Sequence, residues 1–165
     1  MKRILSVLFC IVIICCCFGC TVNDKVQPGN NTVGLKESVT VGKLKFTATE
    51  IEENKGTEFF KPEDGKVFVG INFEIENISQ EEQSVSSLLL FEAYVNDVKC
   101  AYSFSATCAF PEGTLDGDVA AGKKLVGWYA MEVPSDWKKI EVHVRSTWLS
   151  NNSAKFVFQN NERVE

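Results

Sequence analysis

The residues that could carry out catalysis are few, and they do not form a recognised catalytic arrangement. His143 is the single histidine of the chain, so a serine or cysteine nucleophile would have to use it as the base. It lies between Glu141 and Arg145 in an alternating segment, which favours a solvent-facing position. One histidine and two cysteines beyond the first twenty residues make a poor zinc-ligand set. We therefore predict no catalytic residue, no metal and no cofactor, and we expect that the protein is not an enzyme.

Two acidic turns are the remaining candidates for chemistry. Glu63-Asp64 and Asp116-Gly117-Asp118 could hold calcium, a cation that prefers oxygen ligands. Neither spacing matches an EF-hand, and Asp and Gly are favoured in turns for backbone reasons. We interpret both segments as turns. An envelope enzyme, or an accessory to one, that uses these loop carboxylates is the alternative function.

Phe59 and Phe60 form an aromatic pair in a predicted loop, between Lys55-Gly56 and Lys61-Pro62. Exposed aromatic side chains often mark a binding surface. Aromatic side chains in a loop can also fold back and cap one end of the core. The pair is a candidate binding loop, and the sequence leaves both interpretations open.

The first twenty residues are typical of an export signal. Two positive charges at positions 2 and 3 precede an apolar run over residues 4–18, in which Ser6 is the one conventional polar residue. A membrane-spanning helix usually needs about twenty apolar residues, and polar residues begin here at Thr21. A cleaved signal peptide is therefore predicted, with an uncleaved signal anchor as the alternative.

Gly19-Cys20 closes this apolar run and resembles a bacterial lipobox. In lipoproteins of that kind, the cysteine sulfur receives a diacylglycerol and the signal peptidase cuts just before it. Gly19 fits the small residue at the cut, whereas Cys17 and Phe18 depart from the usual pattern. The resemblance implies a lipoprotein signal peptide over residues 1–20 and lipid attachment at Cys20. The protein would then be anchored in the cell membrane by two acyl chains, facing the extracytoplasmic side.

Cys100 and Cys108 are the two cysteines outside the signal region. A pair of cysteines in an exported domain can form a disulfide, and this bridge would close a loop of about nine residues. Two small buried thiols are the alternative. The sequence leaves both possibilities open.

Charge and length constrain the exported part. Without residues 1–20 the chain keeps 15 basic and 22 acidic residues, a net charge of −7, which disfavours nucleic acid as a partner. Residues 21–34 are polar and contain Pro28-Gly29, as expected of a flexible linker. Residues 35–160 are long enough for one domain with its own core, which we expect to be monomeric.

Alternation with period two dominates this domain. It predicts strands over residues 44–48, 67–75, 89–95, 98–102, 125–133, 140–144 and 154–158, separated by turn residues, and no segment has a sustained helical period. The strand over 125–133 is apolar on both faces, which predicts a central position in a sheet. We predict an all-β antiparallel sandwich of seven to eight strands.

Residues 66–79 and 114–142 resemble the bacterial family called domain of unknown function 4352. The family's apolar strand ends in Glu-Asn, here Glu76-Asn77, and later come an Ala-Gly turn (121–122), a Gly-aromatic pair (127–128) and Val-Pro (133–134). Its members, also termed telokin-like, are immunoglobulin-like sandwiches commonly found on exported lipoproteins of Gram-positive bacteria. The resemblance implies this fold and location over residues 34–158, but no catalytic residues. The loop over residues 101–111 departs from the family, which usually has polar residues there.

These features predict a membrane-anchored, extracytoplasmic lipoprotein whose immunoglobulin-like domain is a binding module of unknown ligand. An envelope protein, a cell-wall component or a small molecule would suit such a module. A structural spacer without any ligand is a third class of function.

Overall fold

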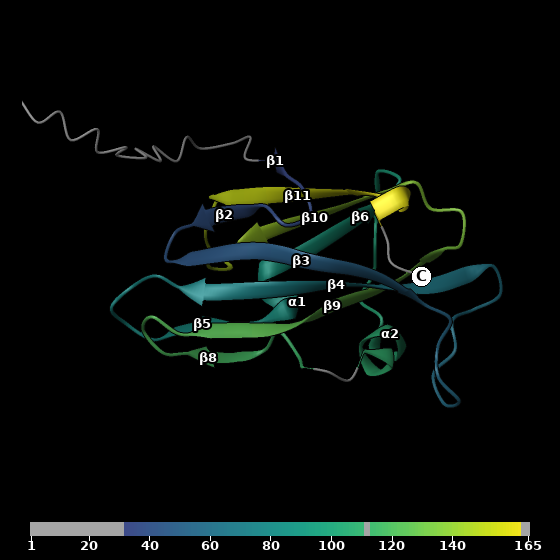
Figure 1. Ribbon diagram of the computed structural model, residues 1–165, viewed down its shortest axis with the longest axis horizontal. Helices are drawn as coiled ribbons and strands as arrows, with labels where there is room; N and C mark the ends of the chain where they lie inside the picture. The colour runs from purple at the N-terminus through teal and green to yellow at the C-terminus, as the bar shows by residue number, and fades with distance from the viewer. Residues whose placement is uncertain (1–31, 111–112, 163–165) are drawn as a thin grey trace, which may run out of the picture.

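Two β-sheets pack face to face in the computed structural model, which describes residues 32–110 and 113–162 (Figure 1). The predicted signal peptide, Cys20 and most of the predicted linker lie outside the described residues. The first sheet has the strand order β1 (Thr32–Val33), β11 (Ser153–Gln159), β10 (Lys139–Arg145), β6 (Phe91–Val95) and β7 (Val98–Lys99). The second sheet has the order β2 (Ser38–Val41), β3 (Leu44–Asn54), β4 (Lys66–Asn77) and β9 (Lys124–Pro134).

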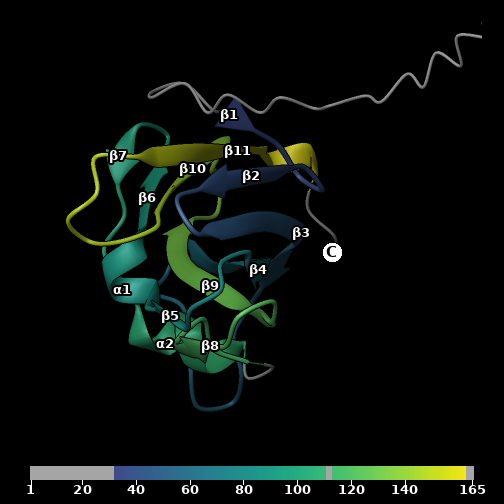
Figure 2. The same ribbon diagram turned by 90° about the vertical axis from the view of Figure 1, so that its left-hand side faces the viewer.

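The remaining elements are short and lie outside the two main sheets. β5 (Gln83–Val85) and β8 (Gly117–Val119) form a separate antiparallel pair beside β9 (Figures 1 and 2). The helical segments are α1 (Ser87–Leu90), α2 (Phe104–Ala109) and the 3-10 turn η1 (Asn160–Glu162). Pairing within the sheets is antiparallel except that β1 runs parallel to β11. The predicted all-β sandwich is confirmed, and its first described strand begins at Thr32, inside the segment predicted as linker.

The core follows from the alternation along the strands, because every second residue points between the sheets. Its centre is aromatic. The ring of Phe73 on β4 meets Phe91 and Phe156 of the opposite sheet edge-on, with centroids 5.3 and 5.1 Å apart. This arrangement suits the quadrupoles of the rings. Within residues 32–110 and 113–162, no helix is long and apolar enough to cross a bilayer.

β6 and β7 form a hairpin around Asn96 and Asp97, which have positive φ angles of 49° and 69°. A two-residue turn of this kind matches the twist of the strands and favours Asn and Asp at its centre. The return strand ends at Lys99, so the strand predicted over 98–102 is shorter than expected. The strand predicted to begin at residue 89 begins at Phe91, because α1 occupies the residues before it.

β9 lies at the edge of its sheet, and the prediction of a central strand was wrong. Its outer face is apolar because α2 packs there, forming a second cluster with Phe68, Ala106, Ala109, Phe110 and Ala130. The segment before β8 also covers part of the free edge of β9, where Trp128 N–H donates to the Gly113 carbonyl at 3.3 Å. The apolar pattern correctly predicted that both faces of β9 are covered. On the outer face, however, the cover is the helix α2 and not another layer of strands.

Gly70 on β4 allows α2 to approach the sheet closely. A Cβ atom at this position would lie 2.6 Å from the ring of Phe110, which is closer than van der Waals contact. We therefore expect Gly70→Ala to destabilise the domain by about 2 kcal/mol through overpacking, as measured by thermal unfolding with circular dichroism. Adding Phe110→Leu should restore part of that loss, because the smaller side chain makes room. If Gly70→Ala leaves the melting temperature unchanged, α2 does not pack tightly against β4.

Asn77, at the end of β4, is the one fully buried polar residue among those described. Its side-chain amide donates to the carbonyls of Glu81 and Val119 at 2.7 and 2.8 Å. Its side-chain carbonyl accepts from the backbone N–H and the hydroxyl of Ser79 at 3.0 and 2.8 Å. The backbone carbonyl of Asn77 accepts from Gly122 N–H at 3.0 Å. One side chain therefore ties β4, the following turn and β8 together.

Candidate functional site

A hollow lies at the side of the sandwich where β6 and β7 of one sheet face β9, the edge strand of the other. Its volume is about 280 Å³, near the lower end of the range for small-molecule sites. Six parts of the chain line it: α1, β6, β7, the segment that follows β7, β9 and β10. The lining residues are Ser87, Leu88, Leu89, Phe91, Glu92, Ala93, Lys99, Cys100, Tyr102, Tyr129 and Arg145.

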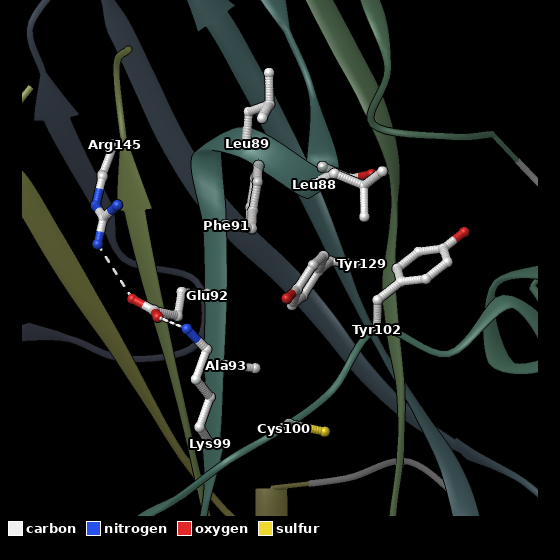
Figure 3. Close-up of a pocket in the computed structure, with 11 residues that line it drawn as sticks. Leu88, Leu89, Phe91, Glu92, Ala93, Lys99, Cys100, Tyr102, Tyr129 and Arg145 are labelled. Atoms are coloured by element: carbon white, nitrogen blue, oxygen red, sulfur yellow. Dashed lines mark hydrogen bonds and ion pairs between the residues drawn. The ribbon is translucent and has the colours of Figure 1, made fainter. Parts of the chain in front are cut away.

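The charged and the aromatic residues that line this hollow lie on opposite sides of β6. Figure 3 shows Arg145, Glu92 and Lys99 on one side of the β6 ribbon and Tyr129 and Tyr102 on the other. Arg145 Nη2 lies 3.1 Å from a carboxylate oxygen of Glu92, and Lys99 contacts the other oxygen. The hydrogen bond from Lys99 holds the pKa of Glu92 below its ordinary value. Two cations around one carboxylate leave this side of an acidic protein with a local positive charge.

On the aromatic side, the ring of Tyr129 is held in place by its neighbours. Tyr129 stacks on Phe91 with centroids 5.0 Å apart, which fixes its ring between the sheets. Burial raises the pKa of Tyr129 well above its ordinary value, so the hydroxyl stays protonated and can donate a hydrogen bond. Leu88, Leu89 and Tyr102 are mostly exposed around the rim. The site therefore offers apolar surface, aromatic faces and a few polar groups.

A second hollow of about 440 Å³ adjoins the first and shares Lys99, Cys100 and Tyr102 with it. It extends under the β6–β7 hairpin toward Glu132 of β9. Because the two hollows have walls in common, they form one continuous candidate surface, named here the edge hollow. The edge hollow is thus defined by the lining residues of both hollows taken together.

Cys100 and Cys108 are separate thiols in the structure, so the bridge considered from the sequence is not formed in it. Cys100 packs against the main core, and its sulfur lies 3.6 Å from the Glu132 carbonyl oxygen. Cys108 lies in α2. Burial raises the pKa of the Cys100 thiol, which keeps the group protonated and weakly nucleophilic at neutral pH.

The aromatic pair divides between the two roles weighed from the sequence. Phe59 is 84 % exposed. Phe60 folds back against the α2 cluster and meets the ring of Phe104 edge-on, with centroids 6.2 Å apart. Both residues belong to the loop between β3 and β4, and neither lines the edge hollow. As a binding loop, this segment therefore presents one free aromatic side chain.

The other candidate residues have structural partners. His143 is half-buried on β10, beside the ring of Tyr94 and 3.5 Å from Glu141. Asp116 accepts bonds from the Ser87 backbone and hydroxyl, both at 2.9 Å, at the start of α1. Asp118 accepts from the Ser84 hydroxyl at 2.5 Å. Among residues 32–110 and 113–162, no group of three or more His, Cys, Asp or Glu side chains could hold a metal ion.

The two facing sheets and the connections around them define an immunoglobulin-like β-sandwich domain. A family model matches residues 33–155, and the chain belongs to that family, described as "Domain of unknown function (DUF4352)". The resemblance seen in the sequence is thereby confirmed. No curated protein sequence matches the chain significantly.

Solved structures with the same fold come from bacteria. A candidate lipoprotein of Bacillus subtilis, ycdA, is 14 % identical with a TM-score of 0.61, and the match covers 75 % of this chain and 38 % of that one. An uncharacterised β-sandwich protein of Clostridium difficile 630 is 21 % identical with a TM-score of 0.53, over 82 % and 98 % of the two chains. The yjhA protein of Bacillus subtilis is 16 % identical with a TM-score of 0.54, over 74 % and 96 %. At such identities the likeness shows the fold alone.

The edge hollow was not predicted from the sequence. Its residues come from segments far apart in the chain, and several are apolar residues that a pattern assigns to the core. One signal was present: Leu88, Leu89 and Tyr102 are large apolar residues next to strand ends, and the structure leaves them exposed.

Proposed function

We propose that the protein is a lipid-anchored, extracytoplasmic binding module and that the edge hollow is its binding site. The proposal rests on one combination of features. Leu88, Leu89 and Tyr102 are exposed around the rim, and the ring of Tyr129, which stacks on Phe91, lies at the bottom. Exposed aromatic and aliphatic side chains around a depression mark interaction sites. The arginine and lysine beside Glu92 would favour a ligand with a negatively charged or polar end.

Several contacts support binding over the alternative of an enzyme that uses loop carboxylates. Asp116 accepts bonds at the start of α1, Asp118 accepts from Ser84 across the β5–β8 pair, and Glu63 pairs with Lys66 at 2.6 Å. The one cysteine in the edge hollow is held as a neutral thiol. The family membership and the ycdA neighbour support the exported, lipid-attached part of the proposal.

Photocrosslinking in living cells tests the binding site. A benzophenone amino acid placed at Tyr102, which is 54 % exposed inside the edge hollow, should give a defined adduct on irradiation. The matched control is Val126, which is 51 % exposed on the outer face of β9. Mass spectrometry then identifies the captured protein, wall fragment or small molecule.

The expected result is an adduct from position 102 that is absent at position 126. Leu88→Ser and Leu89→Ser together should reduce its yield several-fold, because they remove the apolar rim. Equal yields from both positions would contradict a site in the edge hollow. No adduct from either position, or from Phe59, would instead favour a spacer without a ligand.

A further inference from the structure

The loop between β10 and β11, residues 146–152, presents two large apolar side chains at its tip. A turn closes where Ser150 N–H donates to the Thr147 carbonyl at 3.1 Å, so Trp148 and Leu149 occupy the two central positions. They are 65 % and 73 % exposed. We name these two residues the apolar tip. Their side chains are largely uncovered by the domain.

The base of this loop is firmly placed at one end of the sandwich. Ser146 packs against the turn between β2 and β3 so closely that a Cβ atom on Gly42 would lie 2.5 Å from its hydroxyl oxygen. Figures 1 and 2 show the loop and this turn at the same end of the two sheets. The apolar tip therefore projects from a fixed part of the domain.

The first strand, β1, begins at that same end of the domain. β1 runs parallel to β11, with Thr32 beside Lys155 and Val33 beside Phe156, and β11 starts directly after the loop. Thr32 therefore lies on the side of the domain that carries the apolar tip. Cys20 lies twelve positions before Thr32, a distance of about 40 Å at full extension and about 20 Å as a random coil.

We propose that the apolar tip docks on the surface of the bilayer that holds the lipid of Cys20. The inference rests on the lipid attachment in the proposed function. A lipid so close keeps the tip at a high effective concentration at the bilayer, so a weak contact is sufficient. Tryptophan suits this position because its amphipathic ring prefers the membrane interface.

The contact is apolar rather than electrostatic. The nearby cations already have partners: Arg145 pairs with Glu92 at 3.1 Å, and Lys43 pairs with Glu81 at 2.5 Å. The exported part of the chain is also acidic, with 22 acidic against 15 basic residues. Anionic headgroups are therefore not needed, and neutral lipid should be sufficient.

Fluorescence quenching by brominated lipid tests this proposal on the lipidated, full mature protein. The protein is reconstituted into phosphatidylcholine vesicles with and without bromine on the acyl chains. We expect brominated lipid to quench the wild-type emission, and Trp148→Phe to reduce this quenching several-fold. Trp128→Phe is the matched control, because Trp128 lies against the α2 cluster, and it should retain the quenching. Trp137 is 1 % exposed and should stay unquenched.

Lipid attachment is measured on the same samples by incorporation of a fatty-acid analogue. If the protein is labelled but wild type and Trp148→Phe are quenched equally, or neither is quenched, docking is overturned while the anchor stands. If emission from Trp148 instead shifts as protein density in the vesicles rises, without quenching, the tip contacts a second copy, and docking on lipid is also overturned. An unlabelled protein would overturn both the anchor and the docking that rests on it.

Discussion

Asn77→Ala should lower the free energy of unfolding by about 3 kcal/mol and the melting temperature by about 10 °C. The reason is that the substitution removes the four hydrogen bonds of a fully buried side chain. The Val119 carbonyl and the Ser79 backbone N–H would lose the bond that Asn77 gives them, whereas the Glu81 carbonyl would keep its bond from the Ser79 hydroxyl at 3.0 Å. Unsatisfied buried groups cost more than the bonds themselves contribute. Chemical denaturation followed by circular dichroism measures the effect.

Asn72→Ala is the matched control, because this asparagine lies on the same strand but is half exposed and bonds to Thr49. It should cost less than about 1 kcal/mol. Asn77→Asp sharpens the test, since burial would raise the pKa of the new carboxyl group. A raised pKa makes the folded variant bind protons more tightly than the unfolded one. The loss in its free energy of unfolding, relative to the wild type, should therefore become smaller as the pH falls. Equal losses from Asn72→Ala and Asn77→Ala would contradict a special role for Asn77.

Cys20→Ala should abolish both lipid attachment and removal of the signal peptide. The sulfur of Cys20 is the proposed acceptor of the diacylglycerol, and alanine offers no group that could replace it. The variant should accumulate as an unprocessed precursor that incorporates no fatty-acid analogue. Metabolic labelling and gel mobility measure this all-or-none change.

Cys15→Ala provides the control, because Cys15 lies in the same apolar run, outside the positions compared with the lipobox, and is preceded by Ile14 rather than by glycine or alanine. It should remain labelled and processed like the wild type. A Cys20→Ala protein that is still labelled and cut would refute the assignment. Loss of labelling in both variants would point instead to a general export defect.

The fold was predictable where burial follows a simple period. β4 shows this well, because its alternating residues give one face to the core over its whole length. α2 was not predictable, because its six residues are too few to show a helical period, and its stability comes from packing on β4 and β9. The edge position of β9 was hidden for the same reason. A strand covered by a short helix has the same apolar pattern as a strand between two others.

The family motif gains a physical explanation that the sequence could not supply. Asn77 and Gly122 belong to two motif pieces far apart in the chain, yet they are hydrogen-bonded partners, and Gly122 has the positive φ of 68° that its turn requires. In this chain the two motif pieces therefore hold each other in place. The edge hollow is different, because Glu92, Lys99 and Arg145 have no motif. Only pairing of β6 with β7 and β10 brings them together.

The parallel pairing of β1 with β11 gives the domain a mechanical property. If the protein is anchored as proposed, a force that pulls the domain away from the bilayer enters at Thr32, and β1 holds only two residues against β11. This short pairing should yield before the load reaches β2, which begins at Ser38 and is paired along its length with β3. Release of residues 32–35, up to Lys36, whose N–H donates to the Ala48 carbonyl at 2.7 Å, would lengthen the tether by about 14 Å. Under load, β1 would therefore detach first and lengthen the tether, while the strands of the two main sheets stay paired.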